Sequence, residues 1–342
     1  MTTNLVQLLH TSDNTRAVAL VEEPNLRLLT GATSIYELAQ QCLAAGTEIA
    51  AHAHSLATGQ VLSYDEVYAG TSPWCLLFPI DVPGAPSRVL VAGTGLTHLG
   101  SASQRQAMHL AGQSAQEKKP EVLTDSMRMF QWGIEGGRPA EGEVGIAPEW
   151  FYKGDASVLR APFEPLEIPS HAEDGGEEAE IAGIYIIASD GTPYRIGMCN
   201  ANEFSDHKFE RRNYLNLAGS KLRACSLGPE LVIDAPFANL HGYVRIERAA
   251  TPLWERNIAS GEDNMAHSLA NLEHHHFKFS GHRQPGNVHV HFFGADALSF
   301  GAGITLQEGD IAEVSFEGFG RALRNPIHEE ERSTIPIIVR PL

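Results

Sequence analysis

Two glutamates ahead of an apolar run are the residues of this chain whose types and spacing point most directly to chemistry. Glu178 and Glu180 alternate along the chain and lead into residues 181–187, a run typical of a buried strand. Side chains two apart on a strand share a face, about 7 Å apart. Two such carboxylates repel each other unless a cation lies between them, and Mg²⁺ prefers oxygen ligands of this kind. The alternative is a solvated acidic loop, because segment 173–177 is acidic as well.

Other charged residues lie at the ends of predicted strands. Glu203 follows a second strand at a polar turn, where it can serve as a third oxygen ligand or as a helix cap. Glu149 and Lys153 flank the aromatic run 150–152. They either face a site or extend from the aromatic residues to water.

Five histidines offer imidazole nitrogen as a ligand. His274, His275 and His276 are consecutive, and no regular element points three consecutive side chains at one centre, so we expect a surface or interface role for them. His289 and His291 share one strand face, where they either line a pocket or pack in the core with a satisfied hydrogen bond. Zinc bound by imidazoles is the transition-metal alternative.

A small N-terminal module is predicted to precede these residues. The apolar runs 5–9 and 17–21 read as paired strands across a polar turn, and Ser34 begins a capped helix. The proline-rich segment 81–86 marks the boundary, so we expect a small domain over residues 1–85 and a catalytic domain over 86–342.

The larger unit is predicted to be rich in β-strands. Residues 88–98 read as a buried strand that enters a turn with glycines, either to approach a ligand or simply to reach a helix. Residues 100–145 are polar and weakly periodic, and form either a lid or a surface insertion. Further strand-like runs occur at 242–248, 287–294 and 335–339. Short turns between strands and few long helical patterns favour an α+β class.

Composition narrows the classes of function. No apolar run of the 342 residues reaches the length of about 20 that a membrane span needs, and the N-terminus lacks the pattern of a signal peptide, so we expect a cytoplasmic protein without a membrane partner. A net charge of −17 argues against binding of nucleic acid. The four cysteines form no CxxC pair, which argues against a disulfide framework or a cysteine zinc site.

The motifs resemble those of the fumarylacetoacetate hydrolase superfamily over about residues 88 to 327. The resemblance rests on the order of these motifs: Pro148, Phe151-x-Lys153, Glu178-x-Glu180, Asn202-Glu203, Lys221, Gly228-Pro229 and Gly309-Asp310. It implies a mixed β-roll catalytic domain and a homodimer. It also implies Mg²⁺, with Mn²⁺ as a substitute, on Glu178, Glu180 and Glu203, and a functional role for Lys221.

Departures from the hydrolase pattern indicate a particular branch. Ser101 and Gln104 stand where hydrolases of the superfamily carry the His and Glu that activate water, and the third metal ligand is Glu203 in place of Asp. The usual substrate turn is replaced at 293–296. A Glu-Glu-Glu trio, the turn that contains Thr97 and Ser101, and Glu149 ahead of Phe-x-Lys are similar to the branch that dehydrates 2-keto-3-deoxy sugar acids, and to proteins of the GguC type.

The resemblance implies a Mg²⁺-dependent dehydratase that converts a 2-keto-3-deoxy-pentonate to 2,5-dioxopentanoate. Glu149 is the first candidate for proton transfer, and Lys221 is the alternative base or a second anchor for the keto oxygen. The residues expected to bind substrate are Lys153, Ser101, Thr97, Arg105 and Ala295. Two alternatives stay open, a hydrolase of a C–C bond in a 2,4-diketo-3-deoxy sugar acid and a sugar-acid binding protein without turnover.

Overall fold

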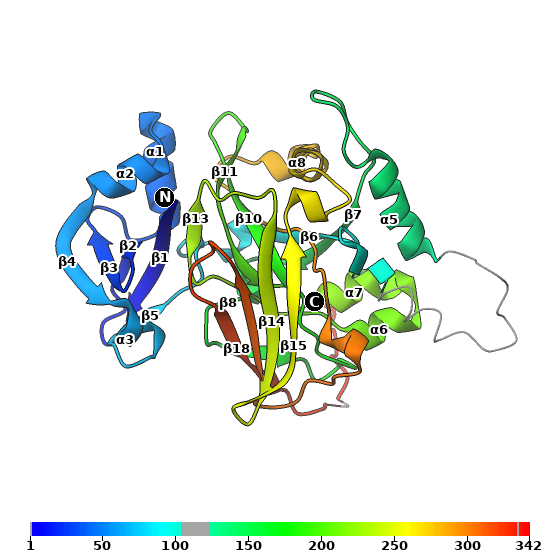
Figure 1. Cartoon of the computed structure of the whole chain (residues 1–342). Coiled ribbons are helices and arrows are strands. Elements are labelled where there is room, and N and C mark those ends of the chain that lie inside the picture. The colour runs from blue at the N-terminus through cyan, green and yellow to red at the C-terminus, as the bar shows by residue number, and fades with distance from the viewer. Residues whose placement is uncertain (1, 101, 104–123, 334) are drawn as a thin grey trace, which may run out of the picture.

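The structure, a computed structural model, describes residues 2–100, 102–103, 124–333 and 335–342. Within these residues thirteen strands form one sheet and five form a second. Short helices lie around the edges of the two sheets (Figure 1). The predicted α+β class is therefore confirmed.

The large sheet has the strand order β4-β3-β2-β1-β13-β11-β10-β16-β6-β7, with β5 paired to β1 and β12 paired to β11 and β8. Its strands are β1 (Thr3–His10), β2 (Arg16–Glu22), β3 (Asn25–Leu29), β4 (Ala57–Ser63), β5 (Trp74–Leu76), β6 (Val89–Gly95), β7 (Glu149–Gly154), β8 (Leu159–Arg160), β10 (Ala179–Ile187), β11 (Pro193–Asn202), β12 (Cys225–Leu227), β13 (Leu231–Ile233) and β16 (Val288–Phe292).

The second sheet has the order β15-β14-β17-β18-β9. Its strands are β9 (Leu166–Ile168), β14 (Leu240–Arg248), β15 (Thr251–Ser260), β17 (Ile311–Phe316) and β18 (Leu323–Glu329). The α-helices are α1 (Ile35–Ala45), α2 (Ile49–Ser55), α3 (Tyr64–Tyr68), α5 (Asp125–Gly136), α6 (His207–Arg212), α7 (Leu217–Lys221) and α8 (Leu269–Phe277). Short 3-10 turns are η1 (Pro86–Arg88), η2 (Ala156–Val158), η3 (Tyr214–Asn216), η4 (Glu262–Asn264), η5 (Ser280–Arg283) and η6 (Ser299–Ala302).

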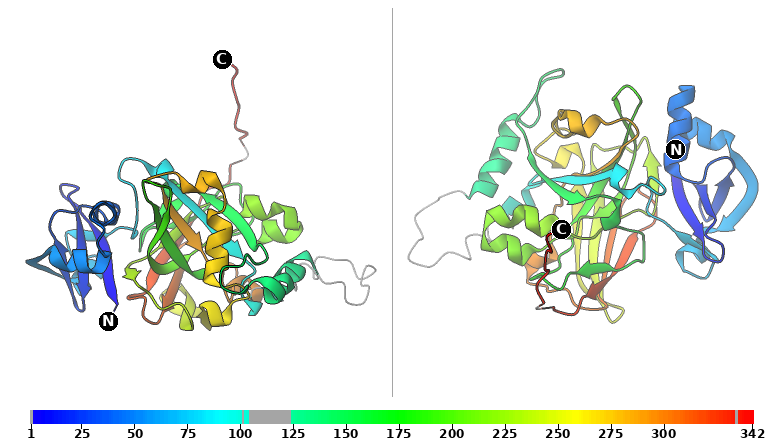
Figure 2. Two further views of the ribbon diagram at one scale, coloured as in Figure 1. Left: turned by 90° about the horizontal axis from the view of Figure 1, so that it is seen from above. Right: turned by 180° about the vertical axis from the view of Figure 1, so that it is seen from behind.

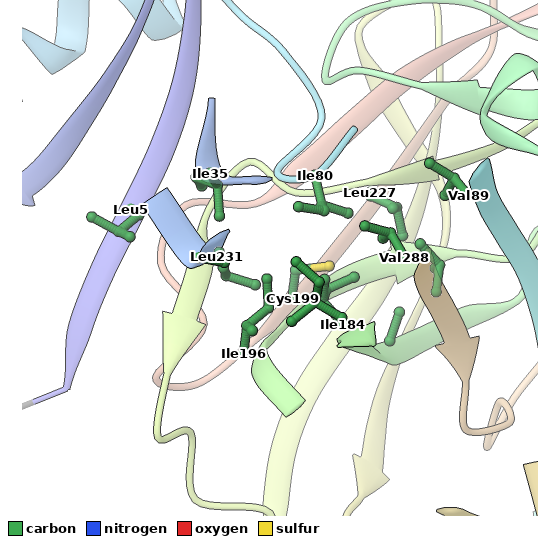
Figure 3. Close-up of a cluster of buried hydrophobic side chains, with 14 of the residues drawn as sticks. Leu5, Ile35, Ile80, Val89, Ile184, Ile196, Cys199, Leu227, Leu231 and Val288 are labelled. Atoms are coloured by element: carbon green, nitrogen blue, oxygen red, sulfur yellow. The ribbon is translucent and has the colours of Figure 1, made fainter. Parts of the chain in front are cut away.

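The N-terminal module forms as its sequence pattern predicts. Strands β1 and β2 pair antiparallel, and the side chain of Ser34 caps α1 by accepting a hydrogen bond from the backbone N–H of Glu37. Strand β1 also pairs with β13, so the large sheet continues from the module into the rest of the chain. Leu5 and Ile35 belong to the same buried cluster as Leu231 and Ile184 (Figure 3). The division into two domains at residue 85 stays a prediction.

Strand β10 is buried along its whole length and separates two apolar clusters. Ala182, Ile184 and Ile186 belong to one cluster, whereas the alternate residues Ile181 and Tyr185 belong to the other. This alternation follows from the two-residue period of a strand. It means that functional side chains on β10 and its neighbours are sorted between two faces of the sheet.

Two other segments bear on the predictions. The strand expected at 335–339 is absent from the described chain: these residues are extended, unpaired and exposed, and the tail projects from the body (Figure 2). Pro336 lacks the N–H that a ladder needs, which disfavours a strand there. In the predicted lid, α5 is a capped helix and residues 104–123 lie outside the described ones, so the lid stays a prediction. No helix in the described ranges is long and apolar enough to cross a membrane.

Candidate metal centre

The three glutamates singled out by the sequence lie together. Glu178 immediately precedes β10, Glu180 is its second residue, and Glu203 immediately follows β11, which pairs antiparallel with β10. The backbone N–H of Glu203 donates to the carbonyl of Glu178 at 2.9 Å, which continues the pairing past the strand ends. One carboxylate oxygen from each glutamate lies within 4.8 Å of the other two. All three side chains belong to buried residues, so the trio forms an enclosed acidic cluster.

Two buried lysines contact this acidic cluster. Lys221, the last residue of α7, donates from Nζ to Oε1 of Glu178 at 2.6 Å and also to Glu203. Its ammonium lies 4.7 Å from the ring centre of Phe151. Lys153, on β7, donates to Glu203 and to the carbonyl of Phe204, the latter at 2.9 Å. Both predicted lysines therefore reach the glutamates from elements distant in sequence.

The electrostatics of the acidic cluster favour a further cation. Burial raises the pKa of Glu180 well above its ordinary value, and the negative charges of Glu178 and Glu203 raise it further. Burial also raises the pKa of Glu203, although Lys153 and Lys221 oppose the shift. The two ammonium groups balance only part of the charge of the three carboxylates. Carboxylate oxygens that lie this close together are the ligands that a hard divalent cation such as Mg²⁺ prefers. The residues present therefore fit this ion.

Backbone and histidine donors orient the glutamates. The N–H of Gly294 donates to Oε2 of Glu180 at 2.6 Å. Gly294 has φ 99, and a Cβ at this position would collide with Oγ1 of Thr97, so the close approach requires glycine. Nε2 of His207 lies 3.1 Å from Oε1 of Glu178. Burial opposes protonation of His207, but the hydrogen bond and charge of Glu178 prevail and raise the pKa of this imidazole.

Strand β7 presents Glu149 on the same side as Lys153. Glu149, Phe151 and Lys153 are buried, whereas the alternate residues Trp150 and Tyr152 are exposed. The hydroxyl of Tyr214 donates to Oε2 of Glu149 at 3.0 Å. A carboxylate and an ammonium on one strand face, with the glutamates beside the ammonium, can bind an oxo-acid and move a proton.

Four further residues were predicted to bind substrate, and the structure describes two of them. The hydroxyl of Thr97 donates to the carbonyl of Phe293 at 2.6 Å, so Thr97 supports the turn that carries Gly294. Ala295 is buried directly after Gly294. Ser101 and Arg105 lie outside the described residues. The substrate-binding roles of all four predicted residues, including Ala295, stay predictions.

Sequence reasoning did not single out Ser205, His207 or Tyr214. Oγ of Ser205 donates to Oε2 of Glu203 at 2.9 Å and accepts from Lys221. Ser205 and His207 follow Glu203 at alternate positions, a local spacing that could have identified them. Tyr214 carries no such signal, because its contact with Glu149 joins residues 65 apart in the chain.

The five histidines singled out in the sequence lie in different environments. His274 is exposed, whereas α8 turns His275 and His276 inward, so the surface role predicted for these two is wrong. An interface role stays a prediction. His289 and His291 are buried on β16, in agreement with core packing. Each has one paired ring nitrogen: Nδ1 of His289 with His276 at 2.9 Å, and Nε2 of His291 with Thr94 at 2.6 Å.

No family model matches the sequence, and no curated protein matches it. Solved structures do share its fold. A 2-keto-3-deoxy-D-arabinonate dehydratase complexed with magnesium and 2,5-dioxopentanoate is 17% identical, with a TM-score of 0.67 over 96% of this chain and 99% of that chain. A 2-hydroxyhepta-2,4-diene-1,7-dioate isomerase from Mycobacterium marinum is 15% identical, with a TM-score of 0.57 over 96% and 99%.

A 5-carboxymethyl-2-hydroxymuconate delta-isomerase from Mycobacterium smegmatis is 14% identical, with a TM-score of 0.55 over 96% of this chain and all of that chain. These likenesses confirm, at the level of fold, the resemblance that the motifs indicate. The chain has the fumarylacetoacetase-like fold along nearly its whole length.

Proposed function

We propose that this protein is a Mg²⁺-dependent dehydratase of a 2-keto-3-deoxy sugar acid, which converts a 2-keto-3-deoxy-D-pentonate to 2,5-dioxopentanoate. The observation that carries the proposal is the convergence of Glu178, Glu180 and Glu203 beside two buried lysines. The fold shared with a dehydratase solved with magnesium and 2,5-dioxopentanoate supports it. So do Ser101 and Gln104, because neither side chain is a strong base that could activate a hydrolytic water.

The three glutamates would hold the metal ion. Bound there, Mg²⁺ would polarise the 2-keto group and acidify the protons on C3, an effect worth several kcal/mol. Carboxylate ligands also suit Mn²⁺, which we include as a substitute. With either ion bound, its two positive charges and the ammonium groups of Lys153 and Lys221 would exceed the charge of the three carboxylates, so an anionic substrate would meet local attraction in a chain whose net charge is −17.

Glu149 is assigned the proton transfer. The reaction breaks a C3–H bond to form the C2–C3 enol, whose electrons expel the C4 hydroxyl as water, which restores the C2 ketone and leaves a C3–C4 double bond. Loss of a proton from C5 and protonation of C3 then give the C4–C5 enol, which relaxes to the C5 aldehyde by protonation at C4. Glu149 is buried on the Lys153 side of β7, and Tyr214 holds its carboxylate in place. Such a group takes the C3 proton or protonates the departing hydroxyl. Lys221 is the alternative base, since it lies among the same carboxylates.

One assay tests the proposal. The full chain is incubated with Mg²⁺ and with 2-keto-3-deoxy-D- and L-pentonates separately, and 2,5-dioxopentanoate is measured. We expect product from the D substrate, none after chelation of the metal, and none from Glu203→Gln. Pyruvate plus a second acid from a 2,4-diketo-3-deoxy substrate would establish a C–C hydrolase instead, and tight binding without product would establish a binding protein. The proposal includes a homodimer, which sedimentation tests.

A further inference from the structure

A cluster of imidazoles lies on the sheet face opposite the one to which Glu180 contributes. His289 pairs across the sheet with Tyr185, and His291 with Gly183. Cross-strand partners share a face, and these two residues of β10 alternate with Glu180. Strand β7 follows the same division, because Lys153 faces the acidic cluster whereas Trp150 contacts the imidazoles.

Three of these imidazoles come from separate elements and converge. His276 is on α8, His282 is in η5, and His289 is on β16. One ring nitrogen from each lies within 4.8 Å of the other two. His276 and His289 are buried and His282 is half-buried, so the histidine cluster has one member that reaches solvent. An ion can therefore enter from the side of His282.

One hydrogen bond defines which ring nitrogen of His282 carries a proton. Nδ1 of His282 lies 2.6 Å from the carbonyl of His276, and a carbonyl can only accept, so this nitrogen carries the proton and Nε2 of His282 the lone pair. An imidazole that donates one N–H to a backbone carbonyl is oriented as metal-binding histidines usually are. The residue that faces solvent is thus prepared to act as a ligand.

The buried partners are incompletely satisfied. Nε2 of His289 and Nδ1 of His291 have no hydrogen-bond partner among the residues that the structure describes. Buried polar atoms of this kind are rare in folded proteins and call for a specific explanation, such as an ion or a water molecule. His291 lies against the same cluster, because the ring centres of His276 and His291 are 4.5 Å apart.

We propose that His276, His282 and His289 bind a divalent transition-metal ion of the zinc class, separate from the magnesium expected at the glutamates. Imidazole nitrogen suits Zn²⁺, Ni²⁺ and Cu²⁺, whereas Mg²⁺ prefers oxygen. The two faces of the sheet therefore carry donor sets that select different ions. Three histidines leave a fourth tetrahedral position for water or another ligand.

The indole of Trp150 should respond to binding of this ion. Its Nε1–H donates to Nδ1 of His276 at 3.2 Å. If His276 binds a metal through Nδ1, that acceptor is used; if it binds through Nε2, the proton moves to Nδ1. Either way Trp150 loses its acceptor. Metal binding must therefore change the environment of the indole.

The experiment uses the full chain without an affinity tag, stripped of metal and then kept in excess Mg²⁺ so that the glutamates are supplied. Zn²⁺ is titrated by calorimetry into the wild type, His282→Ala and the matched control His274→Ala, whose exposed side chain is on α8. We expect one Zn²⁺ per chain in the wild type and control, and an affinity at least about tenfold weaker in His282→Ala. Equal affinity in all three, or no Zn²⁺ binding to the wild type, would overturn the proposal.

Tryptophan fluorescence gives a second reading that does not depend on the folding of His282→Ala. Zn²⁺ should change the wild-type emission at the same stoichiometry, and Trp150→Phe should abolish the change while still binding Zn²⁺. The same signal from Trp150→Phe would show that the ion binds elsewhere. Neither measurement depends on dehydratase activity, so failure of this site is distinguishable from failure of the proposed function.

Discussion

The ammonium of Lys221 lies 2.6 Å from Oε1 of Glu178, and both side chains are buried. Because these residues are 43 positions apart and lie on different elements, this ion pair joins α7 to the start of β10. The same ammonium contacts Glu203. Lys221 is therefore a counter-charge for the acidic cluster, and in the proposed dehydration it is the alternative base.

Lys221→Met should destabilise the protein and abolish activity. Removal of one partner of a buried ion pair leaves uncompensated charge, which costs about 3–5 kcal/mol. Added Mg²⁺ should restore part of this stability, since it supplies positive charge to the same carboxylates. Urea unfolding with and without Mg²⁺ measures both effects. Lys278→Met, at an exposed lysine, is the control, and equal stability of the two variants would contradict the role of Lys221.

Glu149→Gln should keep Mg²⁺ binding and lose most of kcat. A positioned acid or base contributes about 10²- to 10⁴-fold, and glutamine preserves the size and the acceptor for Tyr214. Initial rates of 2,5-dioxopentanoate formation and Mg²⁺ calorimetry are the measurements. Glu143→Gln, at an exposed position ahead of β7, is the matched control. Full activity in Glu149→Gln would remove this residue from the mechanism.

Tyr214→Phe should lower kcat less than Glu149→Gln does and should leave Mg²⁺ affinity unchanged. The lost hydroxyl donates to Oε2 of Glu149, so the variant keeps the carboxylate but loses a group that orients it. Initial rates of 2,5-dioxopentanoate formation and Mg²⁺ calorimetry are the measurements. A kcat equal to that of the wild type would assign Tyr214 no part in positioning Glu149.

Gly294→Ala should weaken both stability and Mg²⁺ affinity. The Cβ would collide with Oγ1 of Thr97, displacing the N–H that holds Glu180. Gly303→Ala is the control, because Gly303 also has positive φ but has open space around its Cβ position. It should lose only about 1–2 kcal/mol from backbone strain and leave Mg²⁺ affinity unchanged. Similar losses of Mg²⁺ affinity in both variants would contradict the specific contact with Glu180.

Stability should fall as the pH drops below about 6.5. Burial lowers the pKa of His98 and of His267 from 6.5 to about 4. The unfolded chain therefore takes up protons between these values while the folded chain does not, so unfolding is favoured progressively as the pH falls from 6.5 to 4, by about 3 kcal/mol for each histidine. Urea unfolding over this range should show a shallower dependence for His267→Gln. An unchanged slope would contradict neutral burial of His267.

Local patterns were sufficient for several parts of this molecule. The alternation at Glu178 and Glu180 ahead of an apolar run predicted two carboxylates on one strand face. The capped helix that begins after Ser34 was also predicted from the sequence. Each of these features depends on neighbours within a few residues, so the backbone period alone determines them.

Long-range pairing determined the rest. Glu203 reaches Glu180 because β11 returns beside β10, and Lys153 and Lys221 arrive from two further elements. His282 meets His276 and His289 only because η5 folds back over β16. Spacing along the chain does not predict these contacts, because the strand order of the large sheet places residues from distant segments side by side. The sequence by itself therefore specified which groups face one way on each strand, whereas the tertiary structure decided which groups share a site, because sheet pairing and packing energies are collective properties of the whole fold.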